Sequence, residues 1–480
     1  MRKITAGGMT LNENSSGGKN IVIVGAGEIG RTVAKTLAVQ GRNIYIVETD
    51  PAKAKRTASE IDAEIIIGNG SRPNILAQAG VFPGGNTDML IACTDRDEVN
   101  MLSCWIARNA GVRKVISRTR SLEFTDTPDW GRKLGIDAMI SPERSISREI
   151  LRLIEVKGAT TAAELLQGRA AMYSMKIGAH SPLCGLSLRD IRPKFPDLSA
   201  VFVYVEHDDG TAGVPDGSTV LRENDICYTV TYNDSSGKLQ DVLQPSIKAD
   251  KSRHKKIFIV GGGKLGTQIA LMIKRHFGNV SLRIIDRDVE RCRRLADEFG
   301  DALVLNADGS DRKTLIDEGI DGAYAYICAT NSDELNMIYC AIAGRLGAQK
   351  TIAVVKRNDY QNLAPSIGIS SAVNTNVSLA NVILQYVQYH DHALAYTMIE
   401  DINAEMLEVS LPENAPVTGM TLAELKLVKG VLVALIGRGD EVLVPSGNTR
   451  LLAGDHVIIF ALSELMPSAA ELFGASYDGH

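Results

Sequence analysis

Apolar and polar positions follow two different periodic patterns along the chain. Runs of β-branched apolar residues, such as IVIV at 21–24 and NIYIV at 43–47, alternate with stretches of helical spacing, such as RTVAKTLAVQG at 31–41. Continuous apolar strands linked by helices predict a parallel sheet that is covered on both faces. Elsewhere, short alternating strands are separated by Pro-Asp-Gly or Pro-Ser-Gly turns, which predict small β-rich α+β domains.

The apolar pattern occurs twice. IVIVGAGEIG at 21–30 returns as IFIVGGGKLG at 257–266, and TDRDEVNM at 94–101 returns as TNSDELNM at 330–337. The β-rich parts repeat as well, because SPLCGLSLRDI at 181–191 resembles APVTGMTLAEL at 415–425. Self-similarity over such a period is the signature of one structural unit used twice.

The predicted fold class is α/β, with two Rossmann-like doubly wound parallel-sheet domains, each followed by a small β-rich α+β domain. Apolar residues at helical spacing also predict a helix after each sheet, as in the segment 142–157, which begins PERSISREILRLIEV. The expected boundaries are a flexible tail at 1–18, the first Rossmann-like domain at 19–141, a crossover helix at 142–158, a small domain at 159–245, a linker at 246–255, the second Rossmann-like domain at 256–375, a second crossover helix at 376–394 and a second small domain at 395–480.

Composition narrows the class of protein. A net charge of −5 gives no reason to expect a nucleic-acid partner, which usually requires a strongly basic face. The seven scattered cysteines form no CxxC pair, which favours a reducing compartment. No apolar run approaches the ~18–20 residues that cross a bilayer, and the first eighteen residues lack the apolar block of a secretory signal. We therefore expect a cytosolic protein.

Glycine-rich turns identify the candidate sites. In each repeat a GxGxxG sequence follows an apolar strand and opens a helix, and the next strand ends in an acid, Glu48 in the first repeat and Asp286 in the second. The glycines allow a tight turn, close approach of a pyrophosphate and close helix packing, while the acid accepts hydrogen bonds from the adenosine ribose. A carboxylate repels a 2′-phosphate and so favours NAD over NADP, although Arg287 beside Asp286 weakens this preference in the second site. The glycines are Gly25, Gly27 and Gly30, then Gly261, Gly263 and Gly266.

Further polar residues lie where the predicted strands end. Thr94 and Asp95 end the fourth strand at the edge where ligands of open α/β sheets bind, but Thr94 equally suits a helix cap before Glu98. Arg118 either faces a phosphate or lies at the sheet edge. Its counterpart in the second repeat is Val354, so the two sites should differ in ligand or affinity.

Catalytic motifs are absent from the sequence. It contains no GxxxxGK[ST], HExxH or GxSxG, and the eight histidines fall at unmatched places in the two halves. His390-Asp391-His392 supplies too few ligands for a defined metal site, so we expect none. Cys104 and Cys340 lie among apolar helix residues and are expected to be buried and unreactive. The sequence does not support an enzyme.

Taken together, GAGEIG, IVETD, GNGS and ACTDRDEVNM, followed by SPLCGLSL and VPDGSTVLRENDICY and then the same order again, resemble the TrkA family of peripheral potassium-uptake subunits. Their modules are called RCK or KTN domains. The resemblance implies a cytoplasmic protein that binds NAD(H) and ATP or ADP, assembles as a dimer or tetramer ring, and gates a TrkH- or TrkG-type membrane potassium channel subunit. It places nucleotide contacts at Gly25, Ala26, Gly27, Glu28, Ile29, Gly30, Glu48, Thr94, Asp95 and Arg118, then at Gly261, Gly262, Gly263, Lys264, Leu265, Gly266, Asp286, Thr330 and Asn331.

In such proteins, nucleotide would bias the conformation through a difference in affinity between states, and the helix at 142–157 would cross to a neighbouring subunit. Packing of that helix on its own domain is the alternative. Two other functions remain open: a soluble NAD-dependent oxidoreductase, and a regulator of a different channel or transporter.

Overall fold

The computed structural model divides the chain into two compact units, Met1–Ile140 with Tyr477–His480, and Ser141–Ser476. The structure describes residues 5–6, 9–10, 20–39, 41–121, 124, 129–232, 235–245, 255–387, 389–390, 393–399 and 402–477. Of the predicted tail, only the short strands β1 (Thr5–Ala6) and β2 (Met9–Thr10) are described. Most of the predicted linker and two of the three residues of the His-Asp-His cluster lie outside the described residues.

The first unit contains a six-stranded sheet in the order β5-β4-β3-β6-β7-β8, in which every neighbouring pair of strands is parallel. Strand order reverses between β3 and β6, and ligands of open α/β sheets bind at such a switch point. The strands are β3 (Asn20–Val24), β4 (Asn43–Glu48), β5 (Glu64–Ile67), β6 (Met89–Ala92), β7 (Lys114–Arg118) and β8 (Ala138–Ile140). The helices are α1 (Glu28–Val39), α2 (Pro51–Glu60), α3 (Pro73–Gln78), α4 (Asp97–Asn109) and α6 (Asp129–Lys133).

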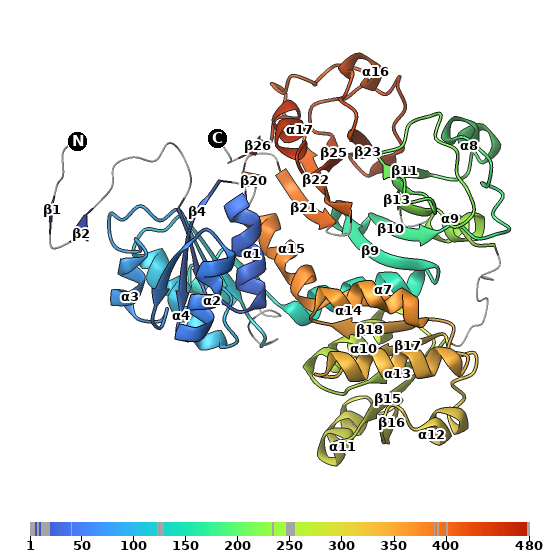
Figure 1. The fold of residues 1–480 in the computed structure, drawn as a ribbon, viewed down its shortest axis with the longest axis horizontal. Helices are drawn as coiled ribbons and strands as arrows, with labels where there is room; N and C mark the ends of the chain where they lie inside the picture. Colours follow the sequence, from blue (N-terminus) through green and yellow to red (C-terminus); the bar gives the residue numbers. More distant parts are fainter. Residues whose placement is uncertain are drawn as a thin grey trace. The chain divides into compact units, whose positions relative to one another are not determined.

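The second Rossmann-like sheet has the equivalent order, β16-β15-β14-β17-β18-β19, and is also parallel throughout. The predicted duplication of the doubly wound domain is therefore confirmed (Figure 1). Its strands are β14 (Lys255–Val260), β15 (Val280–Asp286), β16 (Leu303–Asn306), β17 (Ala325–Cys328), β18 (Thr351–Val355) and β19 (Ser371–Asn374). Its helices are α10 (Lys264–His276), α11 (Val289–Glu298), α12 (Arg312–Asp317), α13 (Asp333–Arg345) and α14 (Asn358–Leu363), followed by the 3₁₀ turn η3 (Ala364–Ile367).

Each small domain is a five-stranded antiparallel sheet, in the equivalent orders β12-β11-β13-β10-β9 and β24-β23-β25-β22-β21. The two sheets share an apolar core that includes Met172 and Val230 from one, and Met406 and Phe460 from the other. The first contains β9 (Ala159–Leu165), η1 (Leu166–Gly168), β10 (Ala170–Lys176), α8 (Leu188–Lys194), β11 (Ala200–Glu206), β12 (Ala212–Gly213), β13 (Ile226–Tyr232) and α9 (Ser236–Leu243). The second contains β21 (Ala393–Ile399), β22 (Ala404–Ser410), α16 (Leu422–Leu425), β23 (Val431–Arg438), β24 (Glu441–Leu443), β25 (His456–Leu462) and α17 (Met466–Leu472), and the short strands β20 (Tyr389–His390) and β26 (Ser476–Tyr477) pair beside it.

Helix α7 (Pro142–Glu155) joins β8 to β9 in the chain and packs against the second repeat. Ser141 caps it through its hydroxyl, with a proline in the first turn. Its buried stripe, which includes Ile146, Ile150 and Leu153, joins the core of α10, so α7 lies between β9 and the second Rossmann-like domain (Figure 1). This stripe is buried on the other repeat of the same chain rather than on the sheet that precedes it, and the crossing of the helix to a neighbouring subunit stays a prediction.

Helix α15 (Thr375–Val387) is the counterpart of α7 in the second repeat, and it packs on α7 and β21. The predicted range of 376–394 runs too far, because β20 starts at Tyr389 and β21 at Ala393. Apolar residues continue through this stretch without a glycine or proline, so periodicity alone did not show where the helix ends.

Candidate functional site

The first glycine turn joins β3 to α1. Gly25 adopts a φ of +105°, and its amide donates a 2.8 Å hydrogen bond to the Val47 carbonyl. A Cβ on Gly30 would overlap the carbonyl oxygen of Gly25, so only glycine fits there, whereas nothing lies within 4 Å of a Cβ built on Gly27. The turn is therefore tight where the helix meets the strand and open where a pyrophosphate would approach. Of the other predicted contacts, Ala26 and Ile29 are buried and Glu28 is exposed.

Glu48 is held beside this turn by backbone amides. Its Oε2 accepts a 2.8 Å hydrogen bond from the Ala26 amide, and its Oε1 accepts one of 2.9 Å from the Asp50 amide. The side chain is only 8% exposed. Oε1 also accepts from the Thr49 hydroxyl at 3.1 Å, while Oε2 retains acceptor capacity. An oriented carboxylate thus lies where the fold binds the ribose.

Thr94 and Arg118 meet across the carboxyl ends of β6 and β7. Arg118 Nη1 donates to the Thr94 carbonyl at 3.2 Å, so its side chain lies over the switch point. Thr94 does not cap α4: Arg96 occupies the N-cap position, and the Thr94 hydroxyl bonds Asn100 Oδ1 at 2.7 Å. Asp95 is exposed at the same edge.

The second glycine turn repeats this geometry between β14 and α10. Gly261 has a φ of +99°, a Cβ on Gly266 would overlap the Gly261 carbonyl, and nothing lies within 4 Å of a Cβ on Gly263. No side chain caps the N-terminus of α10 at Gly263, so the first-turn amides face the space that a phosphate would fill. Lys264 is exposed and Leu265 is half-buried.

Asp286 differs from Glu48 in its partners. Its Oδ2 accepts from the Gly262 amide at 2.7 Å and its Oδ1 from the Asp288 amide at 2.9 Å, but both oxygens also accept from Arg291 Nη1, at 3.0 and 3.2 Å. Burial by itself would raise the pKa of Asp286, but the hydrogen bonds from the Asp288 amide, Arg291 and the Gly262 amide lower it. The acid of the second site is thus already paired with a guanidinium.

At the second switch point, Thr330 repeats the contacts of Thr94, with its hydroxyl 2.6 Å from Asn336 Oδ1. Asn331 is exposed beside it. Val354 is buried and apolar, but Lys356 Nζ donates to the Asn331 carbonyl at 3.2 Å and so supplies a cation at the same edge.

Sequence reasoning missed the residues that shape these edges. Asn100 and Asn336 are fully buried, and each joins the loop after the fourth strand to the end of the fifth, by bonding the carbonyls of Arg118 and Val354. Both asparagines lie inside the repeated TDRDEVNM and TNSDELNM blocks, so the signal was available. Arg291 and Lys356 carried no such signal, because long side chains reveal their partners only in the folded chain.

Side chains that could bind a metal ion do not cluster in the described part of the chain. No three His, Cys, Asp or Glu side chains lie close enough there to hold a metal ion. Cys104 and Cys340 are buried, as expected, and burial raises the pKa of the Cys104 thiol. No helix in the described ranges is long and apolar enough to cross a membrane.

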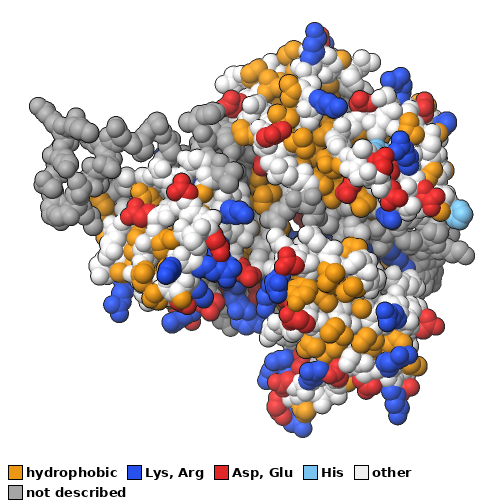
Figure 2. Space-filling view, viewed as in Figure 1, with side chains coloured by type: hydrophobic (Ala, Val, Ile, Leu, Met, Phe, Trp, Pro, Cys, Tyr) orange, Lys and Arg blue, Asp and Glu red, His pale blue; other side chains and the backbone are white. Residues whose placement is uncertain are grey.

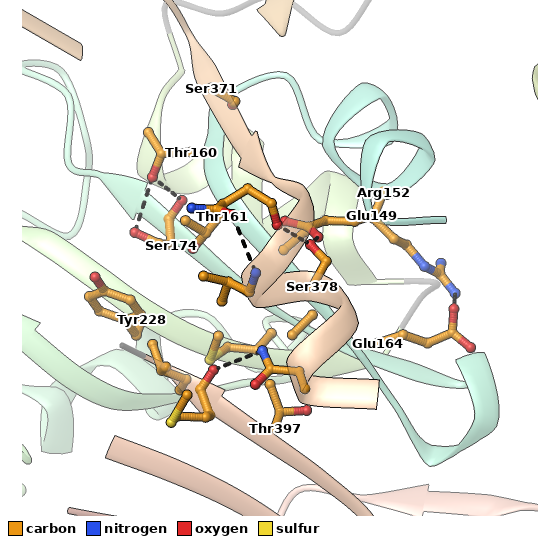
Figure 3. Close-up of a pocket in the computed structure, with 18 of the residues that line it drawn as sticks. Glu149, Arg152, Thr160, Thr161, Glu164, Ser174, Tyr228, Ser371, Ser378 and Thr397 are labelled. Carbon is orange, nitrogen blue, oxygen red and sulfur yellow. Dashed lines mark hydrogen bonds and ion pairs between the residues drawn. The ribbon is translucent and has the colours of Figure 1, made fainter. Parts of the chain in front are cut away.

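A large cavity of about 1290 Å³ lies in the second unit, among α7, α15, β9, β10 and β21. Figure 3 shows Glu149 of α7 directed at Ser378 of α15, whose hydroxyl donates at 2.6 Å, and Arg152 beside Glu164. Burial raises the pKa of Glu149 to about 7, against the lowering effect of Ser378. The cavity is thus lined by polar groups from both helices that follow the Rossmann-like sheets.

Comparison with known proteins assigns the family. The family model of the TrkA-N domain matches residues 21–142 and again 257–375, and that of the TrkA-C domain matches residues 406–474. Trk system potassium uptake protein TrkA homolog 1 of Methanosarcina mazei is 31% identical over 460 residues, which is 94% of this chain and 99% of that protein. The chain belongs to the TrkA family.

Other family members align over similar lengths. The TrkA protein of Azorhizobium caulinodans is 28% identical over 464 residues, covering 95% of this chain and 99% of the relative. Among solved structures, the GsuK RCK domain has a TM-score of 0.58 and 19% identity, with 96% of each chain covered. The GsuK channel bound to NAD has the same TM-score and identity, covering 96% of this chain and 80% of that one. The family assignment predicted from the repeat is thereby confirmed, and the RCK fold of the chain is shown.

Proposed function

We propose that this TrkA-family chain is the nucleotide-sensing regulatory subunit of a potassium-uptake system, binding NAD(H) at its glycine turns, with ATP or ADP as further ligands. One observation carries the proposal: each repeat combines an open glycine turn with a buried carboxylate that the turn itself orients. That arrangement suits an adenosine diphosphate group. The names of the relatives and the NAD-bound state of the GsuK channel support the same ligand class.

The second Rossmann-like domain is tied to the first small domain through the C-terminal end of α7. The Tyr324 hydroxyl donates to the Ile154 carbonyl at 3.2 Å, buried Lys350 donates to the Lys157 carbonyl at 2.9 Å, and Ser371 donates to the Ala159 carbonyl at 3.1 Å. A ligand that favours one conformation of the Rossmann-like domain would therefore displace the start of β9. This connection is a route from nucleotide binding to the small domains.

Assembly and membrane association complete the proposal. Leu102 of α4 is 44% exposed, and Ile338 of α13, at the same place in the second repeat, is 52% exposed. Figure 2 shows hydrophobic side chains gathered over α13 and α14. Duplicated apolar positions on the outer helices suit a homo-oligomeric dimer or tetramer ring. The ring would lie on the cytoplasmic face of the membrane, held by a TrkH- or TrkG-type channel subunit.

Potassium uptake by cells tests the proposal directly. A strain that lacks its own TrkA-type subunit should regain growth at low potassium when it carries this chain together with its cognate membrane subunit. The double variant Gly27→Asp/Gly263→Asp fills both open turns with a charge that repels phosphate, and it should fail to restore growth at equal expression. Restoration of growth by the double variant would contradict nucleotide control.

We also propose that the chain is not an enzyme. Purified protein incubated with NADH and a panel of carbonyl substrates should show no sustained loss of NADH absorbance. Turnover abolished by the same double variant would instead support an oxidoreductase.

A further inference from the structure

The two ribose-binding edges differ at the positions that follow the acid. The first site has Thr49 directly after Glu48 and Lys53 five residues after it, whereas the second has Arg287 and Arg291 at the corresponding distances from Asp286. The second site thus has two guanidinium groups where the first has a neutral threonine and one lysine.

Arg291 contacts the atoms that would bind the ribose hydroxyls. Its Nη1 lies 3.0 and 3.2 Å from the two Asp286 oxygens, and its Nη2 lies 3.8 Å from Asp288. Glu48, in contrast, accepts its hydrogen bonds from the Ala26 amide, the Asp50 amide and the Thr49 hydroxyl. An unpaired carboxylate selects two free hydroxyls and repels a phosphate, while a carboxylate neutralised by arginine loses that discrimination.

Arg287 supplies the second guanidinium. Its side chain is 59% exposed, and it pairs with Asp308 and donates to the Tyr339 hydroxyl at 2.7 Å. Exposed ion pairs contribute little to stability, so exchanging Asp308 for a phosphate dianion costs little. Guanidinium groups bind phosphate through two parallel hydrogen bonds, and arginines near this acid are the usual means of accepting a 2′-phosphate.

We propose that the second site takes an adenine dinucleotide phosphorylated on the ribose 2′ oxygen, the chemical class of NADP(H), while the first takes unphosphorylated NAD(H). Arg287 and Arg291 hold the 2′-phosphate. When the site is empty, Asp286 keeps Arg291 in place and Asp308 keeps Arg287 in place. The inference rests on the proposed function, since it requires both turns to bind dinucleotides. A chain with this arrangement senses the two cofactor pools at separate sites.

Single-site variants make the test direct. Nothing lies within 4 Å of a Cβ on Gly27 or Gly263, so Gly27→Asp leaves only the second site and Gly263→Asp leaves only the first. Calorimetric titration of the full chain should show that Gly27→Asp binds NADPH about tenfold more tightly than NADH, and that Gly263→Asp has the reverse preference. Adenosine 2′,5′-bisphosphate and AMP, which differ by the 2′-phosphate alone, should show the same order.

Adding Arg291→Ala to Gly27→Asp should remove the preference for NADPH, whereas Lys53→Ala added to Gly263→Asp should leave the preference for NADH unchanged. An equal or greater affinity of Gly27→Asp for NADH, or an unchanged preference after Arg291→Ala, would overturn this inference while nucleotide sensing stands. If neither single-site variant binds either dinucleotide while both keep the circular dichroism spectrum of the wild type, the proposed function itself fails.

Discussion

The amide of Ala26 and the carboxylate of Glu48 are joined by a 2.8 Å hydrogen bond, and Gly262 and Asp286 repeat it at 2.7 Å. The bond links the glycine turn, which would bind phosphate, to the acid that would bind sugar. Any ligand that contacts both groups therefore meets a geometry that exists before it arrives, and preorganisation of this kind lowers the ordering cost of binding.

Removing this carboxylate should weaken dinucleotide binding without unfolding the domain. Glu48→Ala deletes the acceptor for the ribose hydroxyls and leaves the Ala26 amide without its partner, which should cost on the order of 1–3 kcal/mol. Calorimetric titration of NADH into the variant measures the loss. Asp62→Ala, at an exposed position of the same domain, is the matched control and should bind NADH like the wild type.

The glycines of the first turn should separate folding from binding. A Cβ on Gly30 would overlap the Gly25 carbonyl, so Gly30→Ala should lower stability by about 1–3 kcal/mol through overpacking. Gly27→Ala meets open space, so it should keep the thermal unfolding midpoint and lose affinity for NADH. Thermal unfolding followed by circular dichroism distinguishes the two, and equal midpoints for both variants would contradict the described turn.

The contact between α7 and α10 should contribute strongly to the second unit. Ile150 is fully buried in their common core, so Ile150→Ala should cost about 2–5 kcal/mol through lost burial and a cavity. Arg148→Ala changes an exposed position on the same helix and should leave the unfolding midpoint nearly unchanged. If the stripe on α7 were free in the monomer, Ile150→Ala would have no effect on thermal unfolding.

Glu149 should make the second unit less stable as the pH rises. Burial raises its pKa to about 7, while an unfolded glutamate has a pKa of about 4.5, so between these values the folded chain holds a proton that the unfolded chain has released. The stability gained from that proton is present below pH 4.5 and is lost as the pH rises to about 7.

Between pH 5 and pH 8 the free energy of unfolding of the wild type should therefore fall further than that of Glu149→Gln, by on the order of 1–3 kcal/mol. Glu405, whose pKa burial also raises to about 7, would account for the decline that remains. Chemical unfolding at the two pH values provides the measurement. Glu298→Gln, at the exposed end of α11, should retain the wild-type pH dependence.

Exposed apolar side chains on the outer helices should govern self-association. Leu102→Asp and Ile338→Asp place charges at the two equivalent positions of α4 and α13, and charges are disfavoured in the centres of interfaces. Each should lower the mass of the assembly measured by light scattering after size-exclusion chromatography. The exposed change Asp62→Ala should not, and full-size assemblies from both charged variants would exclude these helices as the interface.

The sequence determined the repeated architecture because strands, turns and glycines are local features. GAGEIG and GGGKLG each require a backbone conformation that glycine alone tolerates at Gly25 and Gly261, and the apolar period distinguishes strand from helix without knowledge of distant contacts. For the same reason Glu48 and Asp286 were predicted in position: each is the last residue of an apolar strand next to a glycine turn.

Only the tertiary structure decided how those residues are used. That Arg291 pairs with Asp286, that Lys356 reaches the edge where Val354 cannot, and that α7 packs on α10 of its own chain all depend on distances between segments far apart in sequence or on the reach of flexible side chains. Such contacts leave no periodic pattern in the sequence. The partner of a long side chain, and so its interaction energy, depends on which groups the fold places within its reach.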